Sequence, residues 1–266
     1  SKLKNYAIAG INSEIVDLKI LYVEINSTIY FNPSQVASSS NLRTAIISSL
    51  ENYANNVEIN KFGGRFKYSK LNTLIDRVDN GITSNITKVI IRRDLKALLN
   101  QFAQYELCFG NRFNINPAGF NIKSTGFTVS GSNEIGFLTD VPNKDAAGNL
   151  DGSMKGTLSV VFKNHRGEQR VIVKDAGVVD YMKGEVILNT INITSTVSEN
   201  NIIEVQAFPE SNDVVGLKDL YLNFDVSKST INTIKDVIAS GEDVSGIVFQ
   251  RDYYTSSYSN GDLERK

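Results

Sequence analysis

Acidic and basic side chains flank a short Asn-Gly turn in residues 74–95, LIDRVDNGITSNITKVIIRRDL. Asp76 and Asp79 precede the turn, and Arg92 and Arg93 follow it. Carboxylates three residues apart share a helix face, where they can exchange protons or bind a cation. The competing interpretation, which we favour, is a solvated helix edge that nearby arginines partly neutralise. Because Arg92 and Arg93 are adjacent on a predicted strand, they point to opposite faces and cannot form one phosphate clamp.

Other residue types that catalyse reactions are scarce. The one His, His165, stands in a predicted hairpin tip, NHRG, and is interpreted as a solvated turn residue. The one Cys, Cys108, lies in a predicted strand with no basic neighbour in sequence, so we interpret it as a buried core residue. A zinc site made of His and Cys is therefore disfavoured, and a disulfide within the chain is impossible. We predict no catalytic, cofactor-binding or metal-binding residues, and hence no enzyme.

Composition sets further bounds. The chain has 266 residues, a net charge of -1, and 41% hydrophobic and 21% charged residues. The nearly balanced charge does not direct any face towards nucleic acid or a membrane, and we predict neither as a partner, nor a small-molecule substrate. No apolar run is long enough to cross a bilayer, and the first residues do not form a signal peptide. Because the sequence does not begin with Met, we expect a fragment of a longer chain.

Hydrophobic periodicity predicts the elements that position these residues. Alternating apolar residues over 15–31 predict a long strand, and β-branched residues predict another after the Asn-Gly turn. The period changes to that of a helix in three places, namely 40–55, 69–79 and 229–239, with Ser69 as a candidate cap of the second. Strands are also predicted over 102–109, 157–163, 168–174, 185–197, 202–208, 217–226 and 246–258, and residues 139–156 are the best loop candidate.

The order of these elements predicts an α+β, β-rich fold. The predicted helices lie near the two ends of the chain, and the middle is nearly all β. We expect an α/β unit formed by the two ends, with a mostly antiparallel β segment between them. The expected domains are residues 1–125 as the first part of the α/β domain, 126–210 as an all-β domain, and 211–266 as a returning strand-helix-strand with a polar tail.

Two blocks of the sequence resemble a known family. The first is NVEINKFGGRFKYSKLNTLIDRVDNGITSNITKVIIRRDL, residues 56–95, and the second is VIVKDAGVVDYMKGEVIL, residues 171–188, with its DY-x-KGE core at Asp180 to Glu185. Both resemble the large baseplate wedge subunit of T-even-type contractile-tailed bacteriophages, in the baseplate J-like group. The blocks cover under a quarter of the chain, and the long N-terminal part of such a subunit is missing.

The resemblance implies a structural role. Members of the family form dimers and a ring around the tail hub, hold other wedge proteins, and rearrange when the sheath contracts. It implies a virion protein of the tail baseplate that assembles in the host cytoplasm and has no catalytic residues. On this hypothesis Asp76, Asp79, Arg92 and Arg93 become candidate contacts between subunits. Tyr253 and Tyr254 join them, because Tyr is favoured at protein interfaces.

Two other functions stay open from the residues alone. The polar, Asn-rich β region suits a tail-associated adhesin that binds carbohydrate, although the chain lacks the Trp that often forms glycan platforms. A carboxylate-dependent hydrolase could use Asp175 with Asp180 or Glu185, which lie around two glycines in a predicted turn. Turn chemistry explains the same residues without catalysis.

Overall fold

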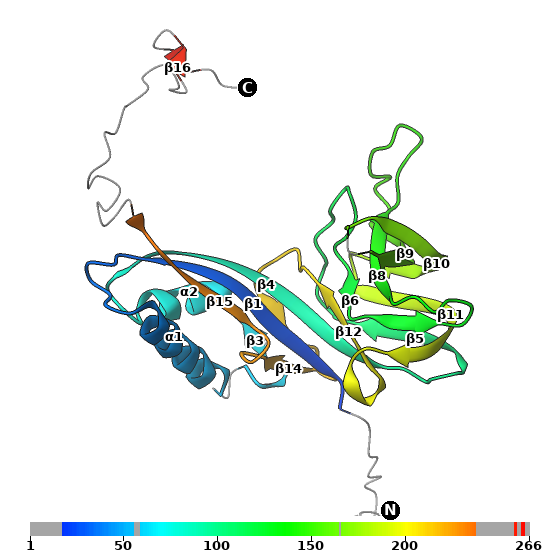
Figure 1. The fold of residues 1–266 in the computed structure, drawn as a ribbon, viewed down its shortest axis with the longest axis horizontal. Helices are drawn as coiled ribbons and strands as arrows, with labels where there is room; N and C mark the ends of the chain where they lie inside the picture. The colour runs from blue at the N-terminus through cyan, green and yellow to red at the C-terminus, as the bar shows by residue number, and fades with distance from the viewer. Residues whose placement is uncertain (1–17, 56–58, 165, 238–257, 260–261, 264–266) are drawn as a thin grey trace, which may run out of the picture.

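The computed structural model describes residues 18–55, 59–164, 166–237, 258–259 and 262–263 (Figure 1). In the described part the fold is α+β and β-rich, as predicted, with two helices and two large sheets. A sheet with two helices on one side forms one half of the molecule, and a small barrel forms the other half (Figure 1). Neither described helix is both long and apolar enough to span a membrane.

The first sheet is built on two long antiparallel strands. β1 (Ile20–Phe31) pairs with β4 (Ile82–Lys96), with Tyr22 opposite Arg92. β12 (Ile202–Ala207) extends the sheet beyond β4, and β6 (Lys123–Ser124) lies beyond β12. On the other edge of β1 lie β14 (Tyr221–Phe224) and β15 (Thr230–Lys235), both parallel to it, and β2 (Lys61–Phe62) pairs with β14. The register of β1 with β4 shifts between Tyr30 and Phe31.

Two helices cover the apolar face of this sheet. α1 (Ser39–Ala54) buries Leu42, Ile46 and Leu50 as one stripe, and Ser38 caps its first turn. α2 (Tyr68–Asp76) is anchored to the sheet by the Tyr68 hydroxyl, which donates to the Thr87 carbonyl. A small pair, β3 (Arg65–Phe66) with β13 (Val214–Val215), lies beside them.

Two helix predictions are corrected. Residues 229–239 do not begin a helix, because Thr230–Lys235 form β15 on the edge of β1, and residues 238 and 239 lie outside the described part. Their β-branched residues favour a strand, and pairing with β1 decides between the two periods. In α2 the N-cap is Lys67, not Ser69, and the helix ends at Asp76, so Asp76 and Asp79 do not share a helix.

The second sheet closes into the barrel. Its strands are β5 (Phe102–Cys108), β7 (Phe127–Val129), β8 (Gly136–Pro142), β9 (Lys155–Lys163), β10 (Gln169–Asp180) and β11 (Glu185–Thr196). The sheet runs β10-β9-β8-β7-β11-β5, and β10 also pairs with β11, which closes the ring. The predicted hairpin is confirmed as β9 and β10. The one-turn η2 (Glu199–Asn201) leads from β11 into β12.

Predictions near the C-terminus are tested only in part. The strand predicted over 217–226 is shorter, since β14 begins at Tyr221. The strand predicted over 246–258 lies outside the described residues except for Tyr258. That residue belongs to β16 (Tyr258–Ser259), which pairs with β17 (Asp262–Leu263).

A buried tyrosine-carboxylate bond lies within the barrel, and the same carboxylate binds the segment before β6. The Tyr181 hydroxyl donates to Asp140 Oδ2 at 2.6 Å, and Asp140 Oδ1 accepts from the Ile122 amide at 2.7 Å. Burial raises the pKa of Tyr181 above its usual value, and the bond to Asp140 adds to the rise, so the phenol remains a donor. Both of the Asp140 oxygens are thus satisfied although the residue is fully buried.

We expect Tyr181→Phe to lower the free energy of unfolding by about 1.5–3 kcal/mol, because it leaves a buried carboxylate oxygen without a donor. Urea unfolding monitored by fluorescence measures the change. Tyr105→Phe is the matched control, since the Tyr105 hydroxyl accepts from the exposed Leu98 amide and should matter less. Equal losses in the two variants would contradict the importance of burial.

Candidate functional site

The charged residues around the Asn-Gly turn, which the sequence offers as candidate catalysts, lie in different surroundings. Asp76 is exposed at the end of α2 and accepts a hydrogen bond from the Asn85 side chain. Asp79 shapes the turn into β4, where its carboxylate accepts from the Gly81 amide at 2.7 Å. Both bonds are local and stabilise the helix-turn-strand connection. The two carboxylates therefore form no paired site within the chain.

Arg92 and Arg93 occupy opposite faces of β4. Arg93 shares its row with the buried Val89, Ile91 and Leu95, on the face that the helices cover. Arg92 lies on the other face, beside Tyr22 in the neighbouring strand. Both arginines are buried, at 2% exposure for Arg92 and 8% for Arg93. Burial on both faces requires a separate set of partners for each guanidinium.

Arg92 is the centre of a buried ionic cluster. The cluster consists of Arg92 with Glu24, Asp94, Glu204, Asp225 and Lys228. Arg92 Nε donates to Glu24, which is 3% exposed, and Nη2 donates to Asp225 at 2.9 Å. The guanidinium also bonds Asp94 at 2.5 Å and lies 3.4 Å from Glu204.

Neighbouring groups complete this cluster. The Arg92 guanidinium stacks over the Tyr22 ring, 4.1 Å from its centroid. The Gln206 side chain donates to the second oxygen of Glu24 at 2.9 Å. Lys228 pairs with Glu204 at the solvent side. Every charge in the cluster therefore has a partner, and the cluster ties β1, β4, β12 and the segment after β14 together.

The segment after β14 brings Asp225 and Lys228 over the sheet. β14 and β15 lie on the same edge of β1, and residues 225–229 interrupt them. At this break the Ile25 amide donates to the Ser229 hydroxyl at 3.0 Å instead of to a strand carbonyl. Because residues 225–229 do not pair with β1, Asp225 can bond Arg92 and Lys228 can bond Glu204.

Burial and the neighbouring charges together shift the pKa values of the groups in the cluster. Burial raises the pKa of Glu24, with further increases from Asp225 and Glu204, against the opposing effect of Arg92. Burial also raises the pKa of Asp94, and Glu204 adds to that rise. For Arg92, burial acts against the charge, but the carboxylates of Asp94, Glu24 and Glu204 outweigh it and raise the pKa. Four carboxylates share two cations, so the cluster holds excess negative charge.

The raised carboxyl pKa values predict a pH dependence. A carboxyl with a raised pKa in the folded state stabilises the fold below its ordinary pKa, and this contribution is lost as pH rises through the folded-state pKa. We expect the unfolding free energy of the wild type, relative to Glu24→Gln, to fall as the pH rises above the ordinary carboxyl pKa of about 4.5. Urea unfolding of both proteins at a series of pH values from about 4.5 upward measures the difference. A difference that rises with pH would contradict the sign of the shift.

Arg93 contacts the barrel. Its Nη1 donates to the Cys108 carbonyl of β5 at 2.6 Å, which joins the two sheets. Cys108 is half-buried, although the sequence predicts a core residue. Burial lowers the pKa of Arg93, against weaker opposing effects from Cys108, Asp94 and Asp219. Thus Arg93 lacks the close carboxylates that surround Arg92.

The other candidate catalytic residues do not form a site in the described part of the chain. Asp180 faces Glu185 across the β10–β11 pair, but its carboxylate accepts from the Lys183 amide within the turn. Glu185 lies 3.8 Å from the Lys183 ammonium, so both acids have turn partners. His165, Tyr253 and Tyr254 lie outside the described residues. In the described part, no three Asp, Glu, His or Cys side chains are grouped to hold a metal ion.

The sequence did not identify Glu24, Glu204 or Asp225 as partners of Arg92. One signal was present: polar residues at alternate positions of apolar strands, such as Tyr22 and Glu24 or Arg92 and Asp94. Asp225 is 133 residues from Arg92, so only the sheet register brings them together.

Residues 19–94 match the model of a protein family described as baseplate structural protein gp6, C-terminal domain III. The matched segment is less than a third of the chain and includes β1, both helices and nearly all of β4. It contains the first resembling block almost completely and ends at Asp94, within the ionic cluster. No curated protein matches this sequence. The family match supports a structural protein of a phage tail baseplate.

Proposed function

We propose that this chain is the C-terminal part of a wedge subunit in the baseplate of a contractile phage tail. The match of residues 19–94 to a baseplate domain carries the proposal, and the description of that domain as C-terminal supports the position within the subunit. The chain would form dimers and a ring around the hub, and the ring would rearrange when the sheath contracts. Assembly would take place in the host cytoplasm, before the tail is complete.

The architecture suits a rigid subunit that transmits movement within a baseplate. The long strands β1 and β4 pair without a register shift from Tyr22 to Tyr30, and a buried ionic cluster ties them to two further segments of the chain. Buried, fully partnered charges resist small displacements, because any shift leaves a charge without its partner. A rigid lobe of this kind can transmit movement between neighbouring subunits without deforming.

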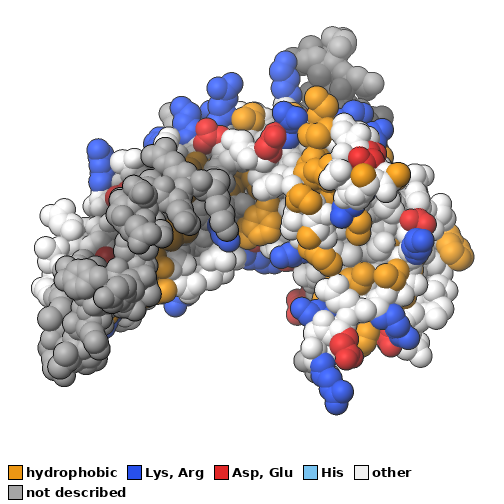
Figure 2. Space-filling view, turned by 90° about the horizontal axis from the view of Figure 1, so that it is seen from above, with side chains coloured by type: hydrophobic (Ala, Val, Ile, Leu, Met, Phe, Trp, Pro, Cys, Tyr) orange, Lys and Arg blue, Asp and Glu red, His pale blue; other side chains and the backbone are white. Residues whose placement is uncertain are grey.

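Contacts between subunits would use exposed groups. Asp76 is exposed and Asp79 is half-exposed, so both can reach a second chain. Figure 2 shows hydrophobic side chains gathered over the barrel half of one face, a composition that is common where protein surfaces meet. The exposed large hydrophobic residues of the barrel strands include Phe102, Val171 and Val178. Tyr253 and Tyr254 remain part of the proposal.

Two measurements test the proposed function. Antibodies against this chain should label the baseplate of phage particles in immunogold electron microscopy, and labelling of capsids or no labelling of virions would overturn it. Light scattering after size-exclusion chromatography should give a mass twice that of the 29.4 kDa chain at high concentration. A monomer at all concentrations would reject the dimer but not the baseplate location.

A further inference from the structure

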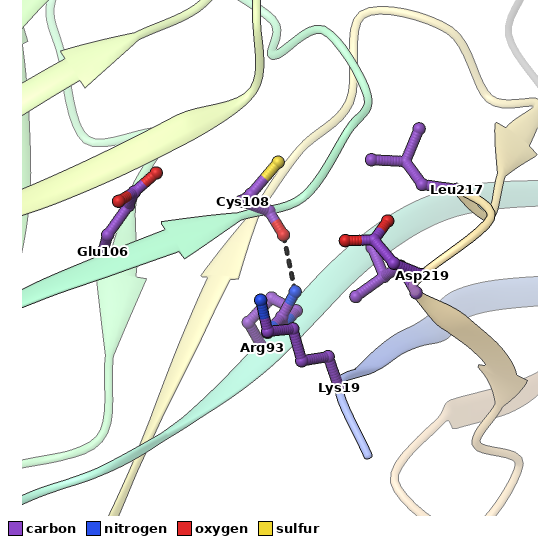
Figure 3. A pocket seen from close by; sticks show the side chains of 7 residues that line it. Lys19, Arg93, Glu106, Cys108, Leu217 and Asp219 are labelled. Atoms are coloured by element: carbon purple, nitrogen blue, oxygen red, sulfur yellow. Dashed lines mark hydrogen bonds between the residues drawn. The ribbon is translucent and has the colours of Figure 1, made fainter. Parts of the chain in front are cut away.

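A small pocket lies where the two sheets meet (Figure 3). Its volume is about 160 Å³, and its lining comes from separate parts of the chain. Arg93 belongs to β4, Glu106 and Cys108 to β5, and Lys19 precedes β1. Leu217 and Asp219 come from the segment before β14. With liquid water at about 30 Å³ per molecule, the pocket has room for a small polar group.

The guanidinium of Arg93 lacks a direct ion-pair partner among the described residues. Its Nη1 donates to the neutral carbonyl of Cys108, and its Nε is buried without a hydrogen-bond partner. Across the described chain no carboxylate lies within 4.0 Å of Arg93, whereas Arg92 has four. A buried charge without a counter-ion is costly, so an anion that enters the pocket gains the interaction.

The acids nearest to Arg93 are held at a distance. Asp219 affects the guanidinium electrostatically but forms no ion pair with it. Its segment is fixed on both sides: before Asp219 the Asn111 side chain donates to the Val215 carbonyl, and after it the Tyr221 amide donates to the Lys19 carbonyl at 2.9 Å. Asp219 is therefore held where it forms no direct ion pair with the Arg93 guanidinium.

The rim of the pocket selects the charge of a ligand. Lys19 is exposed and cationic, while Glu106 and Asp219 are exposed and anionic, so the four ionisable chains including Arg93 sum to zero. A monoanion brings this sum to minus one, and a dianion brings it to minus two beside two carboxylates. The guanidinium fork matches carboxylate and phosphate groups alike, so the charge of the rim is what favours a carboxylate over a phosphate dianion.

We propose that the Arg93 pocket binds a single carboxylate group, supplied either by a Glu or Asp side chain of another polypeptide or by a small free carboxylate. The carboxylate bonds the accessible end of the Arg93 guanidinium, and Lys19 closes over it from the rim. Arg93 thereby acquires the counter-ion that the chain itself does not supply.

Nuclear magnetic resonance of the arginine Nε–Hε groups in the full chain tests this site. Arg93→Lys identifies the Arg93 signal by its loss. We expect sodium acetate to shift that signal saturably, whereas sodium chloride at equal ionic strength does not. Arg112, which is half-exposed and paired with Glu210, serves as an internal control that should not respond. In Arg93→Lys, acetate binding followed at the Cys108 amide should be about tenfold weaker or more, because Lys cannot bond a carboxylate in the bidentate manner.

Three results would overturn the proposal. These are an equal response to chloride, tighter binding of inorganic phosphate than of acetate, and acetate binding that appears only in Asp219→Asn. Acetate binding that appears only in Asp219→Asn would mean that Asp219 itself fills the site in the wild type. The proposal instead expects Asp219→Asn to bind acetate at least as well as the wild type. Blocked peptides separate the two sources. If Ac-Ala-Glu-Ala-amide binds more tightly than acetate and its Gln analogue does not bind, the occupant is a polypeptide; if acetate binds more tightly, it is a small carboxylate.

Discussion

Replacement of Arg92 by Met is expected to lower the free energy of unfolding by about 3–5 kcal/mol. The substitution keeps much of the side-chain volume but leaves Glu24, which is 3% exposed, as a buried carboxylate without its cation. It also removes the counter-charge of Asp94 and Asp225. Urea unfolding at pH 7 measures the loss.

Two controls separate the effect of buried charge from a general effect of losing an arginine. Arg112→Met removes a surface ion pair with Glu210 and should cost less than about 1 kcal/mol. The double variant Arg92→Met with Glu24→Gln should recover part of the loss, because no unpaired buried carboxylate remains at position 24. If Arg92→Met costs no more than Arg112→Met, the cluster does not stabilise the fold in the way described.

Replacement of Gly184 by Ala is expected to cost about 2–4 kcal/mol. Gly184 has a φ of +68°, and an added Cβ would lie 2.0 Å from the backbone oxygen of Asn111. The backbone around it is fixed, since the Gly184 carbonyl accepts from the Phe109 amide at 2.8 Å. The substitution therefore adds a collision with the backbone to the strain of the left-handed conformation. Calorimetric unfolding should show the loss as a lower Tm.

Gly131→Ala is the matched control for Gly184→Ala. Gly131 has a φ of +90°, but nothing lies within 4 Å of an added Cβ. The control should therefore show only the conformational cost, about 1–2 kcal/mol. Losses of the same size in the two variants would mean that the contact with Asn111 relaxes freely.

Hydrophobic periodicity correctly predicted the elements that bury their apolar residues with the same period. Residues 40–55 bury one stripe against the sheet, so the helical pattern in the sequence matches α1. The same argument failed for residues 229–239. Ile231 and Ile234 fit a helix stripe, but Thr230–Lys235 pair with β1, and hydrogen bonding along an open strand edge outweighs a short helical pattern. Only the position of β1 in the sheet distinguishes these outcomes.

The candidate site was predictable only in its residue types. The sequence places Arg92 and Arg93 on opposite faces of a strand, and the structure has them there. The sequence does not show how deeply each face of the strand is buried. The ionic cluster depends on contacts over as many as 182 residues, as between Gln206 and Glu24, and such contacts follow from sheet order and register.

The two edge strands beside β1 affect how the chain can fold during synthesis. β1 ends at Phe31, but its parallel neighbours β14 and β15 begin at Tyr221 and Thr230. At about 5–20 residues per second, a ribosome makes β14 roughly 10–40 s after β1. During this interval one edge of β1 has no strand partner, and Arg92 lacks both Glu204 and Asp225. The sheet built on β1 and β4 therefore cannot be completed until β14 and β15 have been made.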